Sequence, residues 1–261
     1  MELSKRDEDE LRYFDEYTKK YVSLKDENFL VDGKLLSNKG TGTNLIQYRT
    51  IEAMGDIRGK KILDYGCGDG RWAAYFAKRG AITYAFDLSP AFVEITQKRA
   101  RINQVNINCE VMRAQKLNYP DDFFDVVWGV GILHHLDILE VRDELYRVLR
   151  RGGKAYFFEY YEVLQLIHFL QKLRRALSSH STGIYGTMNE KPLNDSDIAI
   201  LSEPFSRTEV KRHRLFARFV NKILGSPEIL WRIAKFDDFV LTKFPLLGNM
   251  SSDCSIVLEK Y

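Results

Sequence analysis

A glycine-rich turn between two carboxylates is the first feature of this sequence that could do chemistry. Asp64 is followed by Gly66, Gly68 and Gly70, and Asp87 comes seventeen residues after the last of these glycines. Glycine lets a backbone pass close beneath a ligand, because no Cβ stands in the way. A carboxylate at Asp87 can accept hydrogen bonds from both ribose hydroxyls of an adenosine, one on each oxygen. The pattern therefore predicts a nucleoside site, whereas the glycines alone could simply form a turn.

The residue at position 71 narrows the kind of ligand that this turn can hold. The dinucleotide-binding fingerprint would require a third glycine at that position, and the chain has Arg71 instead. A cofactor that carries a pyrophosphate is therefore disfavoured.

Two adjacent histidines, His134 and His135, could supply a general base. An imidazole, with a pKa of about 6.5, can accept a proton at neutral pH. Adjacent residues of a helical turn point about 100° apart, so at most one of the two should face a substrate. We predict catalytic roles for His135 and His134, with helix-start or packing roles as the alternative. The pair lacks the spacing of metal ligands, so no metal site is predicted.

A row of tyrosines and one arginine near the N-terminus complete the candidate residues. Tyr13, Tyr17 and Tyr21 repeat every four residues and therefore share one face of a helix. Packing onto the sheet would explain this row; alternatively one hydroxyl closes over the cofactor carboxylate or the substrate, and we predict that Tyr17 binds the cofactor. Arg49 could pair with a cofactor carboxylate, although an exposed helix arginine would explain it equally well.

The elements that must position these residues alternate between strands and helices. Strands are predicted over 61–65, 81–87, 108–112, 124–129, 154–159, 207–215 and 255–259, and helices over 72–79, 90–103 and 139–149. Such alternation predicts βαβ units and a parallel sheet. We therefore expect an α/β fold, a Rossmann-like doubly wound sheet of seven mostly parallel strands, with the glycine turn at its carboxyl edge.

The chain divides into three predicted parts. Residues 1–58 form an N-terminal helical cap, with helices over 3–30 and 44–54, and residues 59–160 form the ligand-binding core. Residues 161–261 contain the last strands of the core and a helical lid, with a helical insertion over 216–242 between strands six and seven.

The composition is that of an ordinary globular protein. Lys and Arg number 39 and Asp and Glu number 36, a net charge of +3 that gives no argument for a nucleic-acid partner. The three cysteines have no metal-type spacing and suit a reducing compartment. The charged N-terminus and the absence of a long apolar run predict a cytoplasmic protein without a membrane span.

The middle of the chain, residues 61–153, resembles the class I S-adenosylmethionine-dependent methyltransferases. The shared motifs, in order, are Ile62-Leu-Asp-x-Gly-Cys-Gly-Asp-Gly70, Asp87-Leu-Ser-Pro90, Phe124-Asp-Val-Val127, Ile132-Leu-His-His-Leu136 and Glu144-x-x-Arg147-Val-Leu-x-x-Gly-Gly153. Because these motifs occur together and correctly spaced, the resemblance is specific.

The resemblance implies S-adenosylmethionine as the cofactor and S-adenosylhomocysteine as the product. The glycine turn would run under the methionine part, Asp87 would hold the ribose, and Leu88 would lie against adenine. Ala114 and Gln115 would meet the adenine edge through their backbone, and the carbonyl of Gly129 would face the cofactor's amino group. The predicted cofactor-binding residues are Asp64, Gly66, Cys67, Gly68, Asp87, Leu88, Ala114, Gln115, Gly129 and Val130, together with Tyr17 and Arg49.

One residue departs from the family's pattern. The family usually has an acidic residue before the alanine at 114, which accepts a hydrogen bond from the adenine amino group. This chain has Arg113, which can only donate. Backbone contacts and packing could hold adenine instead, or Gln115 could substitute.

Residues 190–261 also resemble a subset of these enzymes, more weakly, and this resemblance bears on the methyl acceptor. That subset acts on small molecules and natural products, with O-methylation the commonest assignment. Apolar segments within 223–241 allow a hydrophobic acceptor and a weak association with a membrane surface. The basic residues within 207–222 are explained by a solvated face, with contact to lipid or RNA phosphate as the alternative.

We therefore predict an enzyme that transfers a methyl group from S-adenosylmethionine to a small-molecule acceptor at oxygen. A tRNA or protein methyltransferase is one alternative, and a non-catalytic S-adenosylmethionine-binding module is another. The sequence leaves the oligomeric state open.

Overall fold

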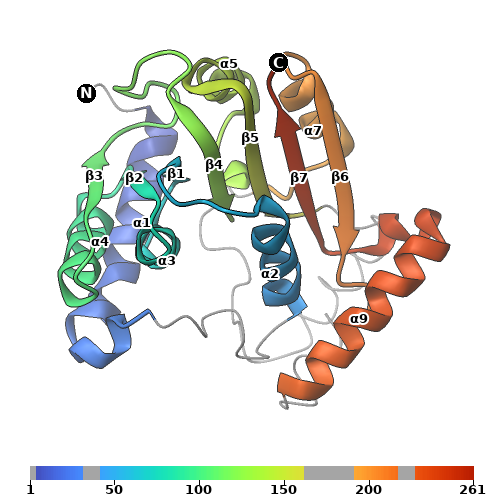
Figure 1. The fold of residues 1–261 in the computed structure, drawn as a ribbon, viewed down its shortest axis with the longest axis horizontal. Coiled ribbons are helices and arrows are strands. Elements are labelled where there is room, and N and C mark those ends of the chain that lie inside the picture. The colour runs from blue at the N-terminus through green and yellow to red at the C-terminus, as the bar shows by residue number, and fades with distance from the viewer. Residues whose placement is uncertain (1–3, 32–41, 162–190, 217–226) are drawn as a thin grey trace.

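The computed structural model describes residues 4–31, 42–161, 191–216 and 227–261. A seven-stranded sheet with the order β3-β2-β1-β4-β5-β7-β6 forms the centre of this part (Figure 1). Its strands are β1 (Lys61–Tyr65), β2 (Ile82–Asp87), β3 (Ile107–Val111), β4 (Phe124–Val130), β5 (Leu149–Tyr160), β6 (Arg207–His213) and β7 (Asp253–Glu259). β7 runs antiparallel to both of its neighbours, and the other pairs are parallel. The predicted doubly wound, mostly parallel sheet is confirmed.

Helices cover this sheet. They are α1 (Lys5–Val22), α2 (Gly42–Met54), α3 (Arg71–Lys78), α4 (Pro90–Ile102), α5 (Ile138–Val148), α7 (Asp195–Ser202) and α9 (Pro227–Lys243), with 3₁₀ turns η1 (Asp26–Phe29), η2 (Leu133–His135) and η3 (Pro245–Met250). α3 packs on β2, α4 packs on β3, and α5 packs on β5 and α7. Within the described ranges, no helix is both long and apolar enough to cross a membrane.

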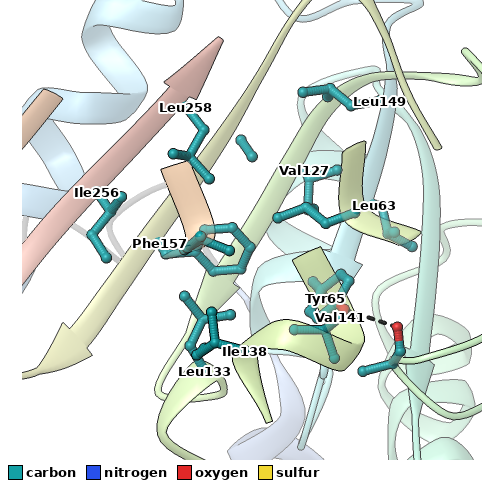
Figure 2. Packing of buried hydrophobic residues seen from close by; sticks show 14 of the residues in the cluster. Leu63, Tyr65, Val127, Leu133, Ile138, Val141, Leu149, Phe157, Ile256 and Leu258 are labelled. Carbon is teal, nitrogen blue, oxygen red and sulfur yellow. Dashed lines mark hydrogen bonds between the residues drawn. The ribbon is translucent and has the colours of Figure 1, made fainter. Parts of the chain in front are cut away.

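The central strands are apolar on both sides, which explains why helices cover both faces of the sheet. On β1, Ile62 packs in a buried cluster with Phe76, whereas its neighbour Leu63 packs in another with Val141 and Phe157. Successive side chains of a strand point to opposite faces, so the two clusters lie on opposite sides of the sheet. Figure 2 shows the second cluster, in which side chains of β1, β4, β5 and β7 meet those of η2 and α5.

The predicted N-terminal cap lies at two separate places on the core. α1 packs against α4, whereas α2 packs against α9 at the other half of the sheet (Figure 1). The helix predicted over 3–30 ends at Val22 and is followed by η1. Parts of the predicted lid, at 162–190 and 217–226, lie outside the described residues, while α7 and α9 confirm helices on either side of β6.

One predicted boundary differs from the structure. The strand predicted over 154–159 begins earlier than expected, because α5 ends at Val148 and β5 starts at Leu149 and runs through Gly152 and Gly153. The register of β5 against β4 shifts in this region, because Leu149 pairs with Phe124 whereas Lys154 pairs with Val126. The glycines therefore belong to an irregular start of the strand.

Strand order fixes where a ligand can bind. β1 lies between β2 and β4, so the chain winds outward in one direction from β1 and then crosses over to wind in the other direction from β4. A parallel sheet binds ligands at such a switch point, beyond the carboxyl ends of the strands. The glycine turn follows β1 and Asp87 ends β2, so both lie at this edge.

Candidate active site

A cavity of about 390 Å³ opens at the carboxyl ends of β1, β2 and β4. Predicted site residues in its wall are Tyr17, Asp64, Gly66, Cys67, Gly68, Asp87, Leu88, Ala114, Gln115, Val130 and His135. Further wall residues include Asp7, Glu10, Phe14, Tyr21, Phe92, Met112, Arg113 and Gly131. The structure therefore brings most of the predicted residues to one place.

The glycine turn forms the floor of this cavity. Asp64 accepts a hydrogen bond from the backbone N–H of Ala73 at 2.9 Å, which fixes the start of α3 behind the turn. Gly66 and Gly68 have φ values of +71° and +49°, which favour glycine. A Cβ at Gly66 would lie 2.5 Å from Ile132, whereas a Cβ at Gly68 would meet no protein atom within 4 Å. The turn thus leaves open space above Gly68 for a ligand.

Asp87 lies beside this open space, and each of its carboxylate oxygens accepts a backbone hydrogen bond. Its Oδ2 accepts from the N–H of Gly68 at 2.9 Å, and its Oδ1 accepts from the N–H of Ser89 at 3.0 Å. Burial raises the pKa of Asp87 to about 6, and these two hydrogen bonds counteract part of that effect. Each carboxylate oxygen has further acceptor capacity, so the side chain can still accept from a pair of ribose hydroxyls.

A buried arginine that the sequence did not single out holds the glycine turn. Arg99 of α4 donates to the carbonyl and the carboxylate of Asp69, at 2.7 and 3.1 Å, and to the carbonyl of Phe29 at 2.9 Å. The hydroxyl of Tyr21 donates to the same Asp69 carboxylate at 3.3 Å. Arg99 is only 3% exposed. Arg99 therefore joins η1 to the glycine turn, and Tyr21 joins the end of α1 to the same turn.

α1 forms one wall of the cavity. Phe14 packs on Phe92 of α4 with ring centroids 5.5 Å apart, and Tyr17 packs on the same ring at 6.2 Å. Tyr17 also stacks on Tyr13 and contacts Tyr21, which confirms that the tyrosines share one face. The structure places Tyr17 at the cavity, and its contact with a cofactor stays a prediction.

Two acidic residues of α1 reach across to the opposite wall. Asp7 pairs with Arg113 at 2.8 Å, and Glu10 lies 3.0 Å from Nδ1 of His135. Both carboxylates are buried, at 6% and 4% exposure. Sequence analysis missed them, although a signal was present. The wall residues of α1, at positions 7, 10, 14, 17 and 21, recur every three or four residues, which is the spacing of one helical face.

The two histidines lie in different surroundings. His135 lines the cavity, whereas His134 does not. Nδ1 of His134 lies 2.8 Å from Oε2 of Glu159, and Oε1 of the same carboxylate accepts from the N–H groups of Ile132 and Leu133, each at 2.9 Å. His134 and Glu159 thus fix the turn after β4, and this placement speaks against the catalytic role predicted for His134.

Arg49 lies away from the position predicted for it, and the contact of the Gly129 carbonyl with a cofactor stays a prediction. Arg49 pairs with Asp238 of α9 and lines a second cavity of about 270 Å³ over β5, β6 and β7. It therefore does not reach the glycine turn. Gly129 lies inside β4, where a Cβ would come within 2.5 Å of Phe157, so its small size serves packing. Val130 and Gly131, the next residues, line the cavity.

The loop after β3 forms the remaining wall. The hydroxyl of Tyr65 donates to the carbonyl of Ala114 at 3.1 Å, the hydrogen bond drawn as a dashed line in Figure 2. The side-chain amide of Gln115 donates to Glu140 at the exposed rim, at 3.2 Å. Among the described residues, no group of three or more histidine, cysteine or acidic side chains could hold a metal ion.

Comparison with known proteins identifies the region around this cavity. Residues 63–157 match the family model of a methyltransferase domain. The ubiquinone biosynthesis O-methyltransferase of Coxiella burnetii is 29% identical over 115 residues, which is 44% of this chain and 49% of that protein. Methyltransferase GfsG of Streptomyces halstedii is 35% identical over 100 residues, 37% of this chain and 36% of that protein. The chain thus spans about half or less of these relatives.

A solved structure shares the fold over a longer stretch. The phosphoethanolamine N-methyltransferase 2 of Haemonchus contortus, in complex with S-adenosylhomocysteine and phosphomonomethylethanolamine, has a TM-score of 0.56 at 17% identity. The match covers 83% of this chain and 52% of that one. At this identity the likeness shows a shared fold.

Proposed function

We propose that this chain, whose residues 63–157 form a methyltransferase domain of the class I, S-adenosylmethionine-dependent type, transfers a methyl group to a small-molecule acceptor. The observation that carries the proposal is the cavity at the carboxyl ends of β1, β2 and β4. Its wall contains the glycine turn and Asp87, and both lie within the part of the chain that matches the domain.

The residues of this wall fit the cofactor. The cavity volume falls within the range of small-molecule sites, about 300–1,000 Å³. Asp87 would hold the ribose, the space above Gly68 would receive the chain that leads to the methionine part, and Leu88, Phe92 and Met112 offer apolar surface to the base. When bound, S-adenosylmethionine supplies a methyl group on a sulfonium that is already activated.

The chain's own contribution is to orient the reactants and exclude water. α1 covers one side of the cavity with aromatic side chains and buried ion pairs. Orientation of two reactants can contribute roughly 7–11 kcal/mol to lowering a barrier. A covered site of this kind supports a small acceptor, because a polynucleotide would need a wide open surface.

His135 is the best-placed general base. Glu10 lies 3.0 Å from Nδ1 of His135, and a negative charge there favours the imidazole tautomer that carries its proton on Nδ1 and accepts one at Nε2. A base of this kind helps a hydroxyl acceptor, because the hydroxyl loses its proton as the methyl group arrives. This pair supports an oxygen acceptor, as does the O-methyltransferase named among the relatives.

Calorimetric titration with S-adenosylmethionine tests the cofactor site. The unaltered chain should bind with a micromolar Kd, Asp87→Ala should lose most of this affinity, and the control Asp143→Ala, at an exposed position of α5, should bind normally. Phenolic and amine acceptors would then be compared with radiolabelled cofactor. Transfer to amines alone would refute the oxygen acceptor, and no cofactor binding by the unaltered chain would refute the function.

A further inference from the structure

The Asp7–Arg113 ion pair lies at a defined place in the cavity wall. Arg113 follows β3, and Asp7 reaches it from the first turn of α1 at 2.8 Å. In the sheet, Asp87 pairs with Val111, and the carbonyl of Asp87 accepts from the N–H of Met112 at 3.1 Å. Arg113 therefore lies one residue past a direct backbone contact with Asp87, on the side of the site that borders β3.

This position determines which part of an adenosine would meet the ion pair. If the ribose is held on Asp87, the base extends over Leu88 toward the loop after β3, because Leu88, Met112 and Ala114 supply the wall there. The edge of adenine carries an exocyclic amino group that donates hydrogen bonds. Arg113 can only donate, so it cannot satisfy that group.

The carboxylate of Asp7 is a hydrogen-bond acceptor that is held in place beside Arg113. The N–H and the hydroxyl of Ser4 and the guanidinium of Arg113 all contact its Oδ2, each at 2.8 Å. Three donors on one oxygen fix the orientation of the carboxylate. The charge of Arg113 also stabilises this buried carboxylate, which is 6% exposed.

The other acidic side chains of the wall are engaged elsewhere. Glu10 faces His135 on the β4 side, and Asp69 is held under the glycine turn by Arg99 and Tyr21. The amide of Gln115 bonds to Glu140 at the rim. Asp7 is thus the carboxylate nearest the loop after β3 in the part of the wall that the structure describes.

We propose, on the basis of the proposed function, that Asp7 accepts a hydrogen bond from the exocyclic amino group of adenine and that Arg113 is the residue that positions it. Helix α1 then supplies the hydrogen-bond acceptor for adenine that the loop after β3 lacks. Recognition of the base would depend on the docking of α1 onto the core.

A pair of ligands that differ at this amino group tests the proposal. S-inosylhomocysteine has a carbonyl oxygen in place of the amino group of S-adenosylhomocysteine and carries a proton on the neighbouring ring nitrogen. Calorimetry with the full chain should show about 10- to 100-fold weaker binding of the inosine ligand, as expected for one hydrogen bond to a charged group. In Asp7→Asn this ratio should fall about tenfold or more, because an amide can donate to the carbonyl oxygen. Arg113→Met should also lower the ratio, because the carboxylate loses its anchor.

The ratio of two affinities is insensitive to the fraction of protein that is folded, so it reports recognition rather than stability. Glu8→Gln is the matched control: it neutralises an exposed carboxylate next to Asp7 in the first turn of α1, outside the cavity wall, and should keep the ratio. If Asp7→Asn keeps the affinity for S-adenosylhomocysteine and the ratio, the role of Asp7 is refuted while the proposed function stands. An unchanged ratio in Arg113→Met alone refutes the positioning role. No binding of S-adenosylhomocysteine by the unaltered chain refutes both this proposal and the proposed function.

Discussion

Cofactor affinity should depend on pH through Asp87. Burial raises the pKa of this carboxyl from its ordinary value of 3.8 to about 6. A ribose hydroxyl donates to the ionised form, so binding requires that the proton leave. Affinity for S-adenosylhomocysteine should therefore be nearly constant well above pH 6 and fall as the pH drops through this value.

The size of this effect follows from the pKa. One pH unit below it, about a tenth of the side chains are ionised, so the affinity at pH 5 should be about tenfold lower than at pH 7.5. The effect on folding has the opposite sign. Because the pKa is higher in the folded chain than in the unfolded one, this carboxyl favours folding at low pH, and that contribution is lost as the pH rises from 3.8 to about 6.

Calorimetry at half-unit steps from pH 7.5 to 5 measures the dependence. Asp87→Asn has no titrating group at this position. It should bind S-adenosylhomocysteine weakly, and its affinity should not show the fall below pH 6. This comparison distinguishes the effect of Asp87 from that of the other titrating groups. A flat affinity for the unaltered chain, or the same slope in Asp87→Asn, would show that the ribose hydroxyls do not depend on this carboxylate.

Three further predictions concern the parts around this carboxylate. Arg99→Leu leaves the Asp69 carboxylate without its buried cation and should lower the free energy of unfolding by about 3–5 kcal/mol, measured by urea denaturation; a change below 1 kcal/mol would contradict the anchoring role. Gly68→Ala places a methyl group in the open space above the turn, at a φ of +49° that favours glycine, so it should lower the melting temperature through strain and also weaken cofactor binding; an unchanged cofactor affinity of the folded variant by calorimetry would contradict a ligand in this space. His135→Ala should lower kcat by about 10²–10⁴-fold at an unchanged cofactor Kd, while Glu10→Gln should lower it less and alter the pH profile; an unchanged kcat in both variants would exclude a general base at this position.

The sheet, and the gathering of most predicted site residues around one cavity, could be predicted because they depend on local patterns. Each strand has its own run of apolar residues. The glycine turn, from Gly66 to Gly70, directly follows β1 in the sequence. Asp87 could be placed because it ends the next strand, and parallel strands bring their carboxyl ends to one edge.

The residues that sequence analysis missed or misplaced depend on contacts between distant segments. Arg99 looks like any helix arginine until η1 and the glycine turn are seen to meet on it. Arg49 was assigned to the cofactor site, and its distance from it follows from the packing of α2 on α9. Asp7 could not be paired with Arg113 before α1 was known to lie across the loop after β3.

The docking of α1 also makes the N-terminus an indicator of ligand occupancy. A ligand that fills the cavity touches α1 and the strand edges together, so each stabilises the bound position of the other, and this coupling is equal in both directions. Amide protons of α1 should then exchange with solvent more slowly when the cavity is filled. Hydrogen exchange confined to one helix would in this way report how firmly the site holds its ligand.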